Sequence, residues 1–208
     1  SPEEQRFKIG LGVHTAMDLA MNVDSARSEK SVQLNEEANR QLEFFLKEAP
    51  GDPVVLTYLM HRAYQAGETQ KVAQLLQLVK DDAVEDHMVW VYRTWYHTLN
   101  SQFREAENTI HEALRIHPAS PLAHHEYAAL LRKQGRIDDA LKEQQLASVG
   151  REIRTRLLQT KSADVVNAEA LLSIAGYLRD CGDQLAFRSL EARLKEFGYT
   201  SEKPDPKP

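Results

Sequence analysis

The sequence has little of what several protein classes require. Its single cysteine, Cys181, cannot form an internal disulfide, so cysteine usage neither indicates nor firmly excludes an oxidising compartment. With 9 glycines and 8 prolines among 208 residues, collagen-like and low-complexity compositions are excluded. No apolar run approaches the ~18 residues that a membrane-spanning helix needs, and no signal peptide is visible. We therefore expect no direct membrane insertion. Localisation stays undetermined, with the cytoplasm slightly favoured.

A block of charge of one sign is also missing. Lys and Arg number 26 and Asp and Glu number 31, which gives a net charge of -5. Because no cluster of basic residues stands out, we do not expect binding to the phosphate backbone of nucleic acids. The hydrophobic fraction of 42% and the charged fraction of 27% are ordinary for a globular protein.

Catalytic and metal-binding motifs are absent as well. A zinc-protease motif begins at His111 and again at His125, but Arg115 and Ala129 occupy the places of the second histidine. There is no C-x-x-C, no P-loop, no G-x-S-x-G and no complete G-x-G-x-x-G. We expect no enzyme, no cofactor and no bound metal, and we interpret the 8 histidines as polar surface or groove residues.

What the sequence does contain is an internal repeat of 34 residues. Gly67, Ser101 and Gly135 follow one another at this step. Small and apolar residues keep the same step in three further columns: Ala38, Val72, Ala106 and Ala140; Leu42, Leu76 and Ile110; Phe45, Val79, Ala113 and Ala147. Agreement of several columns at one period is typical of a repeat architecture.

Helix start signals repeat at the same step. Asp52, Asp86 and Ser120 are good N-cap residues, and Pro53 and Pro121 suit the first helical position. We therefore expect helices to begin near 53, 87 and 121 and to end before Gly67, Ser101 and Gly135. A second helix follows each turn, over 69–82, 103–116 and 137–149. The repeating unit is a helix, a tight turn and an antiparallel helix.

These residues resemble the tetratricopeptide repeat (TPR) family, whose pattern runs W-x2-L-G-x2-Y and then A-x3-F-x2-A-x4-P. The second repeat matches it at Trp90, Ala106, Ile110, Ala113 and Pro118. The resemblance is strong over about 53–150 and partial elsewhere. The positions that depart from the pattern are Arg93, His97, His124 and Gln144. The resemblance implies an all-α fold, a right-handed α–α superhelix (solenoid) of stacked antiparallel helical hairpins.

The expected organisation is one TPR-like domain over 1–200. It has an irregular N-terminal hairpin (1–50), repeats at 53–84, 87–118 and 121–150, and degenerate helices over 151–200. Residues 151–159 either extend the preceding helix or follow it. The last segment, 201–208, holds three prolines and no apolar residue and is expected to be a disordered tail.

The resemblance also implies which first-helix residues face a concave groove that binds a protein or peptide. From these we select His61, Tyr64, Trp95, His125, Arg132 and Arg179 as the candidate partner-binding residues. A plain core role for Trp95 and Tyr64 is an equally open alternative.

A known class within the family, the clamp for a peptide's C-terminal carboxylate, is disfavoured. The positions that match the clamp carry Thr57, His61, Tyr92, Leu122 and Glu126. The main hypothesis is therefore a non-catalytic scaffold for a protein or peptide partner. The alternative is a repeat appendage of a larger enzyme or membrane-anchored protein. The sequence indicates neither the partner nor the oligomeric state.

Overall fold

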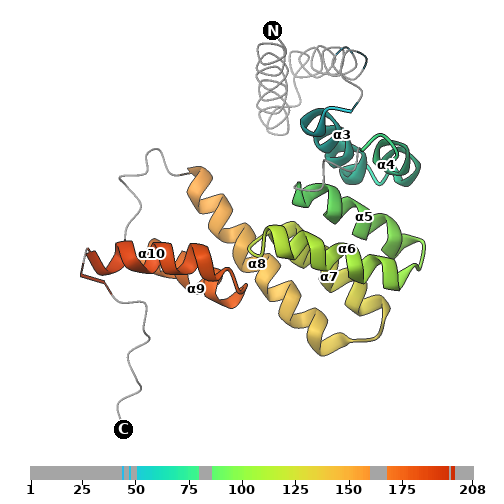
Figure 1. Ribbon diagram of the computed structural model, residues 1–208. Helices are drawn as coiled ribbons and strands as arrows, with labels where there is room; N and C mark the ends of the chain where they lie inside the picture. Colours follow the sequence, from blue (N-terminus) through green and yellow to red (C-terminus); the bar gives the residue numbers. More distant parts are fainter. Residues whose placement is uncertain are drawn as a thin grey trace, which may run out of the picture. The chain divides into compact units, whose positions relative to one another are not determined.

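A computed structural model describes Phe44, Lys47 and residues 51–79, 86–159, 168–196 and 198–199. Every regular element in these ranges is an α-helix, so the expectation of an all-α protein is confirmed (Figure 1). Apart from Phe44 and Lys47, the expected N-terminal hairpin lies outside the described residues, as does the expected tail over 201–208. The chain divides into two compact units, residues 1–92 and 93–208.

The first unit contains a helical hairpin and the start of a third helix. Helix α3 (Pro53–Gln65) packs against α4 (Thr69–Leu76), and α5 (His87–Leu99) begins in this unit. The Asp52 side chain accepts hydrogen bonds from two backbone N–H groups of the first turn of α3, so it is the predicted N-cap. The fully buried residues of the hairpin are Val55, Leu56, Met60, Val72 and Leu75.

The second unit takes the rest of α5 and five more helices: α6 (Phe103–Ile116), α7 (Pro121–Lys133), α8 (Ile137–Gln159), α9 (Ala168–Asp180) and α10 (Gln184–Glu196). Helix α7 packs against α6 and α8, and α9 packs against α8 and α10. Ser120 caps α7 through a hydrogen bond from the backbone N–H of Ala123. In both units the predicted capping residues therefore begin the predicted helices.

The turns inside the hairpins share one backbone conformation. Gly67, Ser101, Gly135 and Gly182 have φ values of 71°, 59°, 77° and 77°, respectively. This left-handed region suits glycine because other residues place Cβ too close to the backbone there. Ser101 is thus the one member of the predicted turn column that adopts the conformation against its own preference.

The small-residue columns explain how the helices approach one another. Ala106, Ala113, Ala140 and Ala147 are all buried, with exposed fractions of at most 1%. The small side chains that repeat at the 34-residue step therefore lie inside the packed helices.

Two helices differ in length from the prediction. Helix α4 ends at Leu76 rather than near 82, because the backbone N–H groups of Leu78 and Val79 bond carbonyls three residues back, not four. Helix α8 runs through 151–159, so this stretch extends the preceding helix instead of following it. An i,i+4 ion pair between Glu152 and Arg156 adds support to the extension. None of the described helices is long and apolar enough to cross a membrane.

Candidate functional site

An aromatic cluster forms in the first unit from two predicted site residues and one from the next helix. His61 and Tyr64 lie one turn apart on α3, with ring centroids 6.5 Å apart in a stacked arrangement. The Tyr92 hydroxyl lies 2.9 Å from His61 Nδ1, and its ring centroid is 5.8 Å from that of Tyr64. We call His61, Tyr64 and Tyr92 the aromatic cluster. The structure thus brings together two of the residues that the sequence analysis selected.

Polar contacts at the start of α5 hold this cluster in place. One carboxylate oxygen of Asp86 caps the helix by accepting from the Met88 backbone N–H at 2.9 Å. The other oxygen accepts from the Thr57 hydroxyl at 2.6 Å. Thr57 lies one turn before His61 on α3, so this hydrogen bond joins the two helices close to the cluster.

Within the cluster, Tyr92 is buried while its two partners are half-buried. Burial, then the charge of Asp86 and the neighbouring Tyr64, raise the pKa of Tyr92 far above its usual value. Its hydroxyl therefore stays protonated and serves as a neutral hydrogen-bonding group. The half-buried His61 and Tyr64 are the members that a ligand could reach.

A second group of predicted residues meets in the other unit. His125 and Arg132 are seven residues apart on α7, so they lie on the same side of that helix. Arg132 Nη1 donates to the Gln144 side-chain oxygen on α8 at 3.3 Å, and Arg151 Nε donates to the Ala147 carbonyl at 3.3 Å. We call His125, Arg132, Gln144 and Arg151 the basic face.

His125 has an unusual environment within this face. Its Nδ1 atom is buried and has no hydrogen-bond partner in the described part of the chain. Burial, then the charges of Arg151 and Arg132, lower the pKa of His125. At neutral pH the basic face therefore carries two guanidinium charges beside a neutral imidazole.

The remaining predicted residues are Trp95 and Arg179. Trp95 is half-buried on α5, in the part of that helix that belongs to the second unit. Arg179, at the end of α9, is exposed and donates through Nε and Nη2 to Asp180 at 3.1 Å. Its guanidinium is engaged with an adjacent residue.

Sequence reasoning missed three participants in these groups. Tyr92 was considered only as a position that failed to match the carboxylate clamp, and Gln144 only as a departure from the repeat pattern. Arg151 was not singled out at all. One signal could have found it, because Arg151 and Gln144 are seven residues apart and so share one side of a single long helix.

A part-buried ion pair lies on the same two helices as the basic face. His124, only 3% exposed, donates through Nε2 to the Pro118 carbonyl at 2.8 Å. Its Nδ1 donates to Glu143 Oε2 at 2.6 Å. Burial alone would lower the pKa of His124, but the neighbouring Cys181 and Glu143 raise it to about 9. His124 is therefore an imidazolium at neutral pH, and with both ring nitrogens donating it cannot act as a base.

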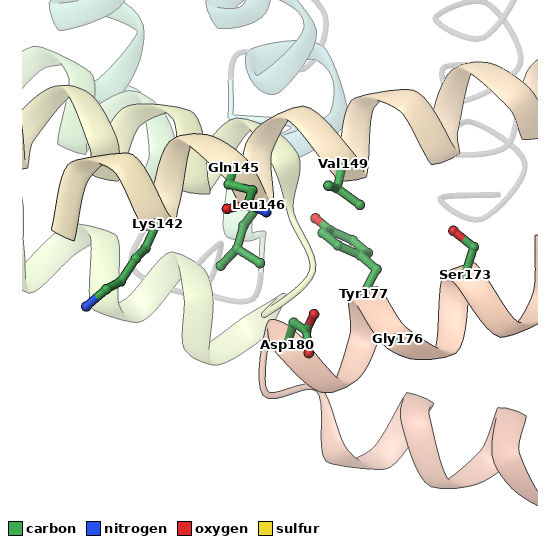
Figure 2. Close-up of a pocket in the computed structure, with 8 residues that line it drawn as sticks. All are labelled: Lys142, Gln145, Leu146, Val149, Ser173, Gly176, Tyr177 and Asp180. Atoms are coloured by element: carbon green, nitrogen blue, oxygen red, sulfur yellow. The ribbon is translucent and has the colours of Figure 1, made fainter. Parts of the chain in front are cut away.

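One cavity of about 420 Å³ opens between α8 and α9 (Figure 2). Its wall is partly apolar, with Leu146 and Val149 from α8, and its charged residues are Lys142 and Asp180. Lys142 pairs with Asp139 at 3.6 Å and Asp180 with Arg179, so both charges are already balanced. None of the predicted site residues lines this cavity. Within the described ranges, no three His, Cys, Asp or Glu side chains gather as a metal site.

Comparison with known proteins finds no relative of this chain. The chain matches no protein-family model, no curated protein and no solved structure. The resemblance to TPR repeats accordingly rests on the residues and spacing of the sequence itself.

Proposed function

We propose that this protein is a non-catalytic scaffold that binds a protein or peptide partner on the first-helix side of its hairpins. The observation that carries the proposal is the recurrence of a helix, a left-handed turn and a second helix at the 34-residue step of Gly67, Ser101 and Gly135. A hairpin of this kind cannot bury its apolar side alone, and stacking of successive hairpins creates an extended binding surface. The proposal includes right-handed superhelical stacking, as in TPR proteins.

The chemistry of the candidate residues supports binding rather than catalysis. The aromatic cluster presents two half-buried rings, and the basic face presents two guanidinium groups. Aromatic and arginine side chains are the residue types that dominate protein interfaces. His124 is buried, and both of its imidazole nitrogens are occupied by hydrogen bonds. The ligand that suits these groups is an extended or helical segment with an apolar anchor and some negative charge.

Affinity capture followed by mass spectrometry tests this function when it is repeated with Trp95→Ala. A half-buried tryptophan that anchors a partner should contribute about 2 kcal/mol or more to binding, so the variant should lose the captured protein. Direct binding of the identified partner is then measured with both purified proteins. The matched control is Tyr96→Ala, which removes the adjacent aromatic side chain of the same helix.

Circular dichroism and thermal unfolding of each variant separate binding from folding. A folded Trp95→Ala protein that retains full affinity for every captured partner would contradict a role for Trp95 in the groove. If Trp95→Ala unfolds the protein while simultaneous Arg132→Ala and Arg179→Ala substitutions leave capture intact, Trp95 is a core residue and the binding surface lies elsewhere.

A further inference from the structure

Two guanidinium groups of the basic face have only neutral hydrogen-bond partners among the described residues. Arg132 donates to a side-chain amide and Arg151 to a backbone carbonyl, both at 3.3 Å. Each guanidinium has five N–H donors, so most remain available to a ligand. Three other arginines of this unit do pair with carboxylates: Arg115 with Glu112, Arg136 with Glu107 and Asp139, and Arg156 with Glu152.

None of the carboxylates of α7 and α8 forms an ion pair with Arg132 or Arg151 in the described part of the chain. Glu126 is 3% exposed, so it lies inside the unit and not on the surface. Glu143 pairs with His124, and Glu152 with Arg156. The first-turn residues Asp138 and Asp139 lie at the opposite end of α8 from Arg151, and Asp139 pairs with Arg136 and Lys142. The basic face therefore carries positive charge that none of these carboxylates neutralises.

His125 adds a directed donor to the basic face. Its Nδ1 atom is buried without a described partner, and a buried N–H without an acceptor costs more than a buried lone pair. The proton of the neutral ring therefore belongs on Nε2. That nitrogen is then available to donate to an anion that also contacts a guanidinium.

The spacing along α7 defines the geometry of the ligand. Seven residues separate His125 from Arg132, which at 1.5 Å per residue is about 10 Å. The charge of Arg151 acts on His125. Arg132, further along α7, donates a hydrogen bond to Gln144 on α8. Two acidic groups about 9 Å apart match the rise from His125 to Arg132 along α7. In a polyproline II segment, residues three apart lie on the same side and about 9 Å from one another.

We propose that the basic face is a subsite for an acidic extended peptide segment, in which two carboxylates three residues apart pair with Arg151 and Arg132 and the first also accepts from His125 Nε2. This inference rests on the proposed scaffold function and assigns the chemistry of part of its ligand. It differs from recognition of a chain terminus because both carboxylates are side chains. Charge complementarity with the uncompensated guanidinium groups favours this occupant over an apolar helix.

The test is an NMR titration of the full chain with two capped peptides, Leu-Glu-Pro-Pro-Glu-Leu and its counterpart with Gln at both Glu positions. We expect the Glu peptide to shift the His125 ring resonances, and we expect Arg132→Gln or Arg151→Gln to weaken its binding by roughly 5-fold. The matched control is Arg104→Gln, which removes the same charge from an exposed position on α6.

The outcomes separate this subsite from simpler explanations. Equal affinity for the Gln peptide, or equal weakening by Arg104→Gln, would overturn the proposal because binding would then not depend on paired carboxylates at this face. Tighter binding of a single-stranded oligonucleotide to the same residues would overturn it in favour of a phosphate ligand. If the peptide fails while Trp95-dependent partner capture persists, the subsite is wrong and the scaffold function stands. If the peptide binds as expected but no partner is captured through Trp95, the subsite stands and the proposed Trp95-dependent partner is wrong.

Discussion

The His124 imidazolium and the Glu143 carboxylate form a part-buried ion pair 2.6 Å long that connects α7 to α8. The second ring nitrogen of His124 bonds the Pro118 carbonyl just before α7. A large aromatic residue is the choice that the repeat pattern favours at position 124. This protein instead uses a charged, hydrogen-bonded side chain at the same place, and its stability should therefore depend on pH.

The first prediction concerns that pH dependence. Because the pKa of His124 rises from 6.5 in the unfolded chain to about 9 in the folded protein, the folded state binds the proton more tightly. The contribution to stability is complete below pH 6.5 and is lost as pH rises through about 9. We expect the free energy of unfolding to fall by on the order of 3 kcal/mol over this window, as measured by denaturant titrations at several pH values.

His124→Phe provides the control for this effect. The variant restores the large aromatic of the repeat pattern and removes the titrating group, so most of the pH dependence between 6.5 and 9 should disappear. His111→Gln, at an exposed position on α6, should leave the pH dependence unchanged. A wild-type unfolding free energy that is constant across this range would show that His124 is neutral in the folded protein.

The second prediction concerns the turn after α5. Ser101 has a φ of 59° and is exposed, so no side-chain packing compensates for its left-handed conformation. Ser101→Gly should raise the free energy of unfolding by about 0.5–1 kcal/mol, since glycine adopts this conformation without the Cβ conflict. Gly135→Ala, in the equivalent turn with nothing within 4 Å of the added Cβ, should lower it by about 1 kcal/mol. Thermal unfolding that moves in the same direction for both variants would contradict this account.

Local sequence signals predicted much of the fold because they act within a few residues. Asp52 and Ser120 cap the helices that they were expected to begin, and Gly67 and Gly135 lie in the expected turns, where both have a positive φ. A cap needs only the N–H groups two or three residues ahead, and a left-handed turn needs only a residue without Cβ. Such features are visible in a single sequence.

The candidate site was less predictable because its contacts join residues far apart in the chain. Tyr92 meets His61 across 31 positions, and His124 meets Glu143 across 19. Helical periodicity places a residue on a side of its helix, but it does not say which side chain of the next helix lies opposite. Of the selected residues, His61 was therefore found without its partner Tyr92, and His125 without Arg151.

The third prediction tests the register of the small-residue column. Ala106 on α6 is fully buried, as is Ile110 one turn later. Ala106→Leu should overpack the contact and lower the free energy of unfolding by about 1–3 kcal/mol. Arg104→Leu adds a leucine at an exposed position of the same helix and should change stability by less than about 0.5 kcal/mol. Equal melting temperatures for Ala106→Leu and wild type would mean that the column does not face a neighbouring helix.

The last prediction compares two glycines inside helices that should respond oppositely to the same substitution. Gly150 is buried on α8, and a Cβ added there would clash with the Tyr177 hydroxyl and lie 2.8 Å from Pro121 Cγ. The Tyr177 hydroxyl donates to the Ala119 carbonyl at 3.0 Å, which fixes the ring in place. Gly176 is on α9, and a Cβ there meets nothing within 4 Å.

Alanine is the better helix former at both positions, by roughly 0.5–1 kcal/mol. Gly176→Ala should therefore raise the free energy of unfolding by about that amount. At Gly150 the same gain is outweighed, because Tyr177 can move only by breaking its hydrogen bond to the carbonyl before α7. We expect Gly150→Ala to lower stability by about 1–3 kcal/mol. The double variant Gly150→Ala with Tyr177→Phe loses the hydroxyl, which is the nearest atom to the new Cβ. Tyr177 Cζ and Pro121 Cγ, at 2.7 and 2.8 Å, stay in place, so only part of the loss should be recovered. Denaturant titration measures the free energy of unfolding of the three variants. An increase for Gly150→Ala alone would show that α8 does not approach Tyr177 this closely.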